Sequence, residues 1–324
     1  MLRADATGNQ THDNMKIVFL DTATVADLPA ELAKFSELGE FTGYERTAPE
    51  QVVSRLAGAD VAIVNKVVLG KGELERLPDL KLICISATGM NNVDLDTAAE
   101  RGIPVKNVSG YSTNSVAQLT ITMLFTLAMD LIHLNQAVYD GTYTKHSAFG
   151  YWRQPFYELS GARYGIVGMG AIGRRVAELA TAFGAEVVHY STSGRAADGP
   201  YPRVSFAELL ETCEVISVHC PLTEKTRNLF TYEDIARMKP SAYLINVARG
   251  GIINEADLVR ALNEGRIAGA ASDVFTTEPI PADHPLLSVR EPHRLLLTPH
   301  VGWASVEART ELLDGVRANI TALG

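Results

Sequence analysis

The sequence predicts an α/β protein with two Rossmann-like parallel-sheet domains and an active site in the cleft between them. Short apolar runs alternate with segments of helical spacing in two successive blocks, a pattern typical of parallel sheets covered by helices on both faces. A glycine-rich turn at residues 163–173 opens the second block. Polar residues directly follow several of the apolar runs, at the edge where open α/β sheets bind ligands.

Composition and charge narrow the class of protein. The 324 residues are 46% hydrophobic and 21% charged, which excludes a disordered or fibrous chain. A formal net charge of -9 disfavours nucleic acid and anionic membranes as partners. The three cysteines form no C-x-x-C pair, so we expect free thiols in a reducing, cytoplasmic setting, and no metal site is predicted. Residues 1–14 are polar and lack the apolar stretch of a signal peptide, so we expect a disordered tail.

The first block begins with a strand at residues 16–21. Further strands are expected at 59–65, 81–87 and 104–108, and helices at 29–38, 49–57 and 93–101, with a turn-rich piece through Gly70 and Gly72. Residues 116–134 are strongly apolar but carry several polar side chains, which indicates one long, largely buried helix rather than a membrane span. An aromatic-rich loop over 139–157 follows this helix.

The second block predicts a second sheet and a change of domain. Its strands are expected at 163–167, 186–190, 214–219, 242–247, 268–274 and 295–298. Residues 305–323 have the spacing of a last helix, and since no strand follows, we expect this helix to return to the first domain. The expected division is a discontinuous, flavodoxin-like substrate domain of residues 15–108 plus 303–324, and a dinucleotide-binding domain of residues 109–302.

Gly168, Gly170 and Gly173 fit the pattern G-x-G-x-x-G between a strand and a helix. The first glycine permits a tight turn, the second lets the backbone approach a pyrophosphate, and the third allows close contact between helix and strand. The start of the helix offers unpaired N–H groups to the phosphates. Methyltransferase folds contain similar turns, so the pattern predicts a dinucleotide site only together with its surroundings.

The turn after the next strand bears on the choice between NAD and NADP. NAD-binding folds usually place an acidic residue there for the ribose 2′-hydroxyl. Here Ser191, Ser193 and Arg195 lie in a turn without a carboxylate, which offers hydroxyl groups and a guanidinium to a 2′-phosphate. We therefore expect NAD or NADP as cofactor and favour NADP. The alternative is that Arg195 is a surface residue and that NADH serves.

Arg249 and His300 offer the two functions that reduction of a 2-oxo acid requires. A guanidinium binds a carboxylate through two N–H groups and keeps its charge. An imidazole exchanges a proton near neutral pH, and Glu278 would favour its protonated form and fix its orientation. A single arginine or histidine after a strand is more often structural. However, Arg249, Asp273 and His300 all follow strands of the second block on the side of the glycine turn, which favours a shared site.

These motifs resemble the D-isomer-specific 2-hydroxyacid dehydrogenases over nearly all of the chain after Met15. Residues 246–251 (NVARGG) are similar to the arginine motif of that family, residues 273–279 (DVFTTEP) to its glutamate motif, and residues 298–300 (TPH) to its histidine motif. The resemblance implies that Arg249 anchors the substrate, that Glu278 orients His300, and that His300 is the catalytic acid or base.

The resemblance also implies further contacts and a homodimer. Asp273 would contact the nicotinamide carboxamide, and the backbone at Thr88 and Gly89 would bind the substrate carboxylate. The long helix and the aromatic-rich loop would contribute to the dimer interface. The residues expected to bind the cofactor are Gly168, Gly170, Ala171, Ile172, Gly173, Ser191, Ser193, Arg195, Cys220, Pro221, Thr226, Val247, Ala248, Asp273, His300 and Gly302.

Residues 87–94, 110–113 and 300–304 look most like the glycerate dehydrogenase and hydroxypyruvate reductase branch, which implies hydroxypyruvate or glyoxylate as substrate. Lys66 would either help to collect the substrate anion or be a solvated loop residue, and Trp303 would be either an anchor for the last helix or a pocket residue. Two alternatives stay open, a dehydrogenase for another 2-hydroxy acid and a dinucleotide-sensing, co-repressor-like binding protein of the same fold. Glu278 argues against a formate dehydrogenase, which has glutamine at that place.

Overall fold

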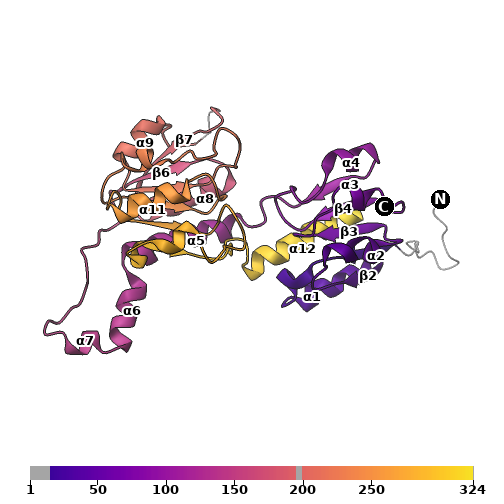
Figure 1. Ribbon diagram of the computed structural model, residues 1–324, viewed down its shortest axis with the longest axis horizontal. Coiled ribbons are helices and arrows are strands. Elements are labelled where there is room, and N and C mark those ends of the chain that lie inside the picture. The colour runs from indigo at the N-terminus through magenta and orange to yellow at the C-terminus, as the bar shows by residue number, and fades with distance from the viewer. Residues whose placement is uncertain (1–14, 195–198, 324) are drawn as a thin grey trace. The chain divides into compact units, whose positions relative to one another are not determined.

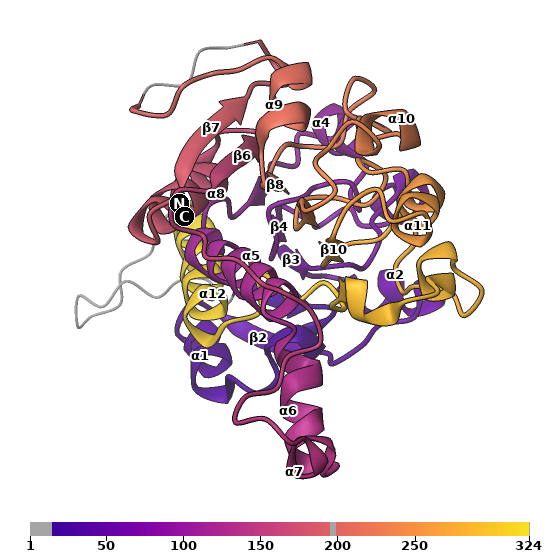
Figure 2. The same cartoon turned by 90° about the vertical axis from the view of Figure 1, so that its left-hand side faces the viewer.

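The computed structural model describes residues 15–194 and 199–323, which form two compact units (Figure 1 and Figure 2). The first unit contains the described residues up to Ser112 together with those from Ala304 onward, and the second contains Thr113–Trp303. Each unit has one sheet, and every strand pair in both sheets is parallel. The α/β class with two parallel sheets is thus confirmed, whereas the cleft between them stays a prediction.

The sheet of the first unit has the strand order β2-β1-β3-β4-β5. The strands are β1 (Lys16–Phe19), β2 (Glu40–Gly43), β3 (Val61–Val64), β4 (Leu82–Ile85) and β5 (Val105–Asn107). The sequences VAIV of β3 and LICI of β4 are buried throughout, as expected for strands that helices cover on both faces. The chain reverses its direction of winding between β1 and β3, and such a switch point is where open α/β sheets bind ligands.

Short helices connect these strands, and one long helix comes from the end of the chain. The α-helices are α1 (Pro29–Ala33), α2 (Val52–Leu56), α3 (Lys71–Leu74), α4 (Leu95–Glu100) and α12 (Val306–Thr321), and the 3-10 helices are η1 (Thr22–Val25), η2 (Lys34–Glu37) and η3 (Pro49–Gln51). Leu313, Val316 and Ile320 of α12 share an apolar cluster with Ile17 and Phe19 of β1. This unit is therefore discontinuous in sequence.

Two local features of the first unit differ from the sequence expectation. The pattern does not predict β2, because this edge strand has the sequence EFTG with three exposed residues and no apolar alternation. The turn-rich piece at Gly70 and Gly72 contains helix α3, which begins where Glu73 Oε2 accepts a hydrogen bond of 3.1 Å from the Gly70 N–H. The Glu73 side chain thus caps the start of α3 at Gly70, where the composition of the segment indicated only a turn.

The sheet of the second unit has the strand order β11-β10-β9-β8-β6-β7. The strands are β6 (Arg163–Val167), β7 (Glu186–Tyr190), β8 (Val215–Val218), β9 (Tyr243–Asn246), β10 (Gly269–Ser272) and β11 (Leu295–Leu297). The bounds of β6 and β7 agree with the sequence expectation. A parallel bridge between His189 and Arg203 adds one more pairing beside β7, where the usual Rossmann order has a further strand.

Helices on both faces of this sheet bury two apolar clusters. The α-helices between its strands are α8 (Ala171–Ala182), α9 (Phe206–Thr212), α10 (Tyr232–Ile235) and α11 (Glu255–Asn263), and the 3-10 helices are η4 (Pro285–Ser288) and η5 (Pro292–Arg294). Val176, Ala177 and Ala180 of α8 pack in the same cluster as Tyr164 and Ile166 of β6.

The prediction of one long helix at 116–134 is wrong, because the chain forms two helices, α5 (Thr113–Ala128) and α6 (Leu131–Tyr139). Asp130 lies between them in the left-handed conformation, with φ 54°, and the two axes are bent by 57°. Such a backbone conformation interrupts a helix. The face of α5 with Val116 and Leu124 is buried, whereas Ala137 is the buried residue of α6. In Figure 1, α6 and α7 (Thr142–Lys145) extend away from the sheet of their own unit.

Within the described residues, no single helix is long and apolar enough to cross a membrane, and only the bent pair of α5 and α6 reaches the necessary length and composition together. The three cysteines are buried and free of disulfides. Burial raises the pKa of the Cys84 thiol to about 12 and that of the Cys213 and Cys220 thiols to about 11. Each of these thiols is therefore protonated and unreactive near neutral pH.

Candidate active site

Three neighbouring strands of the second unit carry Arg249, Glu278 and His300 on the loops that follow them. Strands β9 and β10 pair in register from Tyr243 with Gly269 onward, and β11 pairs with β10 on its other side. Because all three strands are parallel, their carboxyl ends lie at one edge of the sheet. The glycine turn after β6 leaves the same edge.

The buried carboxylate of Asp273 holds the turn that carries His300. Asp273 is 2% exposed and directly follows β10. Its Oδ1 accepts hydrogen bonds from Thr298 Oγ1 at 2.5 Å and from the Val301 N–H at 2.9 Å, and its Oδ2 accepts one from the Gly302 N–H at 2.8 Å. These hydrogen bonds support a structural role for Asp273, which is to hold the turn after β11 in place. The contact of Asp273 with the nicotinamide and the contact of Gly302 with the cofactor stay predictions.

His300 and Glu278 form a hydrogen-bonded pair, with 2.7 Å between His300 Nδ1 and Glu278 Oε2. The carboxylate can only accept, so Nδ1 carries the proton of this bond, and Nε2 is left to exchange a proton with a ligand. Glu278 is held in turn, because its Oε1 accepts a hydrogen bond of 2.9 Å from the Phe275 N–H. The two side chains remain about a third exposed, at 29% for His300 and 32% for Glu278, and therefore reachable from solvent.

The backbone of His300 adopts the left-handed conformation, with φ 54°. A side chain other than glycine in this region costs about 1 kcal/mol or more. The surrounding contacts offset this cost, because Trp303 Nε1 donates a hydrogen bond of 2.8 Å to the His300 carbonyl and the His300 N–H donates one of 3.0 Å to Thr298. Trp303 is thus an anchor of the histidine turn in this structure.

The loop that carries Arg249 is held by a buried amide and by a close backbone approach. Asn246 Nδ2 donates to the Arg249 carbonyl at 2.9 Å, and Asn246 Oδ1 accepts from the Ala248 N–H at 3.1 Å. A Cβ at Gly250 would lie 2.0 Å from the carbonyl carbon of Phe275, so only glycine fits there. The arginine loop therefore lies directly against the loop of Glu278. The exposed Arg249 side chain donates to the carbonyl of Ala248 at 2.7 Å.

The glycine turn has the shape that a dinucleotide pyrophosphate requires. Gly168 has φ 96° and lies so close to Cys220 that a Cβ would come within 2.8 Å of its backbone nitrogen, and a Cβ at Gly173 would come within 2.2 Å of the Gly168 carbonyl oxygen. At Gly170, in contrast, a Cβ would meet no atom of the described residues within 4 Å. Gly170 is the N-cap of α8 and supplies no side chain to cap it, so the first N–H groups of this helix are available to an anion.

The other residues expected at the cofactor occupy several environments. Ala171 is exposed, Ile172 packs partly against an apolar cluster, and Val247 and Cys220 are buried. Thr226 is 2% exposed, and its hydroxyl donates to the Pro221 carbonyl at 2.7 Å, so this side chain braces the loop after β8. Ser191 and Ser193 lie in the turn after β7, and Arg195 lies outside the described residues.

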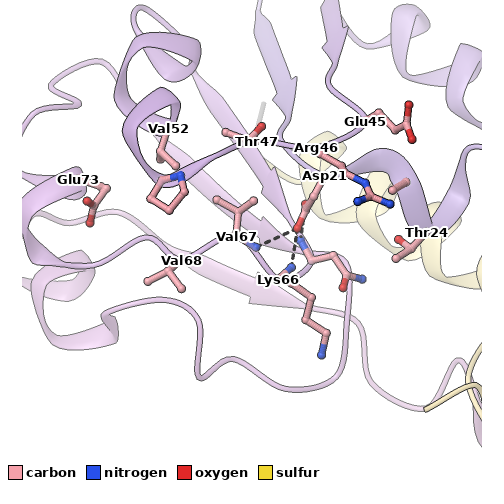
Figure 3. Close-up of a pocket in the computed structure, with 13 residues that line it drawn as sticks. Asp21, Thr24, Glu45, Arg46, Thr47, Val52, Lys66, Val67, Val68 and Glu73 are labelled. Atoms are coloured by element: carbon pink, nitrogen blue, oxygen red, sulfur yellow. Dashed lines mark hydrogen bonds between the residues drawn. The ribbon is translucent and has the colours of Figure 1, made fainter. Parts of the chain in front are cut away.

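In the first unit, Lys66 lines a pocket of about 530 Å³ at the switch point between β1 and β3 (Figure 3). Asp21 also lines this pocket, and its carboxylate accepts hydrogen bonds of 2.8, 2.6 and 2.9 Å from the N–H groups of Asn65, Lys66 and Val67. Arg46 also lines this pocket, from the segment after β2. The sequence pattern misses Arg46 because it does not predict the strand before it.

Thr88 and Gly89 follow β4 and are not among the residues that line this pocket. The Thr88 carbonyl accepts a hydrogen bond of 2.6 Å from Asn107 Nδ2, which fixes the backbone at this position. The Thr88 side chain is exposed and Gly89 is half-buried. The structure therefore brings Lys66 and Arg46 to one pocket and leaves Thr88 and Gly89 on the next loop.

The chain is similar over most of its length to proteins of known class. The family model of the D-isomer-specific 2-hydroxyacid dehydrogenase NAD-binding domain matches residues 121–302. A hydroxypyruvate reductase of Blautia hydrogenotrophica is 38% identical over 93% of this chain and 94% of its own, and a glycerate dehydrogenase of Methylorubrum extorquens is 39% identical over 95% of both. The structure of an acyclic imino acid reductase in complex with NADPH and D-arginine aligns with a TM-score of 0.80 at 28% identity, over 95% of this chain and 96% of its own. The chain belongs to the D-isomer-specific 2-hydroxyacid dehydrogenase family.

Proposed function

We propose that the protein reduces a small 2-oxo acid, hydroxypyruvate or glyoxylate, to the corresponding 2-hydroxy acid with a nicotinamide cofactor. The observation that carries this proposal is the hydrogen bond between His300 and Glu278 on the sheet edge that also bears the glycine turn and the loop of Arg249. The relatives named hydroxypyruvate reductase and glycerate dehydrogenase, which align over nearly the whole chain, support the choice of substrate.

The second unit supplies the residues that would hold the cofactor. Gly168, Gly170 and Gly173, with the start of α8, would bind the pyrophosphate, and Ala171 and Ile172 belong to the same turn. Ser191 and Ser193 would meet the ribose, and the loops at Pro221, Val247, Asp273 and Gly302 would enclose the nicotinamide. A bound dihydronicotinamide supplies the hydride for the carbonyl carbon.

The side chains of this chain then supply the charge and the proton. We assign binding of the substrate carboxylate and carbonyl oxygen to Arg249, because its guanidinium keeps its charge and presents paired N–H groups. His300 donates the Nε2 proton to the carbonyl oxygen, which becomes the hydroxyl group, and Glu278 stabilises the imidazolium before transfer. In the opposite direction, neutral His300 accepts the hydroxyl proton. From the first unit, Lys66 and the backbone at Thr88 and Gly89 are proposed to contribute to binding of the substrate anion.

The roles of His300 and Arg249 differ in the kinetic constants that each should change. For oxidation of NADPH or NADH by hydroxypyruvate and glyoxylate, His300→Ala should lower kcat by roughly 10²–10⁴-fold, because the proton donor is lost. Arg249→Ala should raise KM for the 2-oxo acid and also lower kcat, because it removes a group that binds substrate and transition state. The exposed Arg290 of the same unit is the control, and Arg290→Ala should leave both constants unchanged. A near-normal kcat of His300→Ala would contradict the assignment.

We further propose that NADP is preferred over NAD. Residues 191–194 carry no carboxylate that would repel a 2′-phosphate. Arg203 lies beside this turn and donates a hydrogen bond of 3.0 Å to the Gly194 carbonyl, so a fixed positive charge is close to it. The imino acid reductase of similar fold is in complex with NADPH.

This preference is tested by kcat/KM measured with both cofactors. NADPH should give the higher value, and Arg195→Ala should lower kcat/KM for NADPH by about tenfold or more, the worth of one charge-assisted hydrogen bond, while changing that for NADH little. Arg175→Ala on α8 removes a guanidinium that pairs with Glu178 at 2.8 Å, and should have no effect on the ratio. A preference for NADH that Arg195→Ala does not alter would refute the proposal.

We also propose a cytoplasmic homodimer. Helices α6 and α7 and the loop after them expose large apolar side chains, among them Tyr139 at 83%, Phe149 at 99% and Tyr157 at 79%. Exposed apolar residues gathered on one segment are typical of an interface between proteins. The free, buried cysteines agree with a reducing compartment.

Light scattering tests the assembly. The native protein should have twice the 35.0 kDa mass of the chain, and the double variant Phe149→Ser, Trp152→Ser should shift it toward that of one chain. Leu287→Ser, which replaces an exposed leucine of η4, should leave the mass unchanged. A native protein with the mass of a single chain at micromolar concentration would contradict this proposal.

A further inference from the structure

A second histidine–carboxylate pair lies behind the loop of Glu278. Glu255 is the first residue of α11, and His284 precedes the 3-10 helix η4. Glu255 Oε2 lies 3.0 Å from His284 Nε2, and the two side chains are only 14% and 7% exposed. The sequence motifs assign no role to either residue.

The hydrogen bonds of His284 define its tautomer. Its Nδ1 accepts a hydrogen bond of 3.3 Å from the Leu286 N–H and thereby caps the start of η4. An imidazole nitrogen that accepts carries no proton, so the ring is neutral and its proton is on Nε2. His284 Nε2 therefore donates to Glu255, and the orientation of the glutamate is fixed from one side.

The other oxygen of Glu255 holds the loop that carries Glu278. Glu255 Oε1 accepts a hydrogen bond of 2.8 Å from the Thr276 N–H. Thr276 lies between Phe275, whose N–H binds Glu278 Oε1, and Glu278 itself, whose Oε2 binds His300. The rings of Phe275 and His284 also meet edge to face, with 6.3 Å between their centroids.

The same short segment supports the arginine loop. A Cβ at Gly250 would lie 2.0 Å from the Phe275 carbonyl carbon and 2.3 Å from the Thr276 nitrogen, so the backbones of the two loops are in direct contact at the atom that Glu255 binds. A displacement of Thr276 would therefore move the loops of Glu278 and Arg249 together.

We propose that Glu255 and His284 are positioning residues, which set the loop at Thr276 and through it the places of Glu278 and Arg249. This inference rests on the proposed function, because Glu278 and Arg249 are the groups that it positions. Small displacements of reacting groups are costly, since about 1 Å can reduce a rate by roughly 10²-fold. The pair thus acts on turnover without itself touching the substrate.

The first test compares Glu255→Gln with Asp257→Asn in the full-length protein. The amide of Glu255→Gln accepts from Thr276 but turns an N–H group toward the N–H of His284, so it should lower kcat with hydroxypyruvate by about 10–100-fold and raise KM for this acid. The dissociation constant of NADPH, measured by fluorescence, should stay unchanged. Asp257→Asn removes the same charge from the same helical turn and should leave kcat unchanged.

The second test separates the two hydrogen bonds of His284. In His284→Gln the amide N–H can replace Nε2 and donate to Glu255, whereas in His284→Asn the carbonyl oxygen can replace Nδ1 and cap η4. If His284 positions Glu255, kcat of His284→Gln should stay close to the native value. The kcat of His284→Asn should fall by the same factor as that of Glu255→Gln. A residue needed only for folding of η4 would give the reverse order, which would overturn the proposal.

Amide hydrogen exchange of the peptide containing Thr276 provides a readout that does not require turnover. Exchange should be faster in Glu255→Gln and His284→Asn than in the native protein and unchanged in Asp257→Asn, because only the first two disturb the acceptor of this N–H. Unchanged exchange, or unchanged kcat of Glu255→Gln in an active protein, would refute the positioning role. A native protein without turnover of any 2-oxo acid, with faster exchange in the two variants, would refute the proposed function and leave the control of this loop by Glu255 intact.

Discussion

The geometry of the candidate site depends on the hydrogen bonds that the carboxylate of Asp273 accepts. This carboxylate is buried, it directly follows β10, and it accepts three hydrogen bonds from the turn after β11. These bonds hold His300 in a left-handed backbone conformation that the residue would otherwise avoid. A carboxylate can be buried when several donors bind it, as they do here. Because Asp273 directly follows a strand, these hydrogen bonds tie the turn of His300 to the end of the sheet.

The neighbouring loops are held in a similar way, because a polar side chain of low exposure binds the backbone of each loop and leaves a candidate site residue at the edge of the sheet. The amide of Asn246 holds the segment of Arg249, and the carboxylate of Glu255 holds the segment of Glu278. Gly250 then joins the two segments, because no Cβ can fit between them. Parallel pairing of β9, β10 and β11 places all three loops at one edge, so the sheet and these few bonds together set the site.

Patterns in the sequence predict the parts of the fold that depend on local chemistry. The apolar runs of β6 and β7 and the glycine turn are visible because each combines strong periodicity with a backbone that only glycine permits. Strand β2 is missed because it is exposed at the sheet edge, and the break at Asp130 is missed because the residue in the left-handed conformation is neither glycine nor proline. Glu255 and His284 are missed for another reason. Their partners lie far along the chain, and no spacing rule joins a helix start to loop residues 21 and 29 positions later.

If His300 and Arg249 bind and protonate the 2-oxo acid as proposed, this member of a D-isomer-specific family should form a single enantiomer of the product. The most direct measurement is the configuration of the glycerate that the purified protein forms from hydroxypyruvate, determined by chiral chromatography after complete conversion with NADPH or NADH. D-glycerate is expected as the sole product with either cofactor. Formation of L-glycerate, or of a mixture of both enantiomers, would contradict the proposed roles of His300 and Arg249.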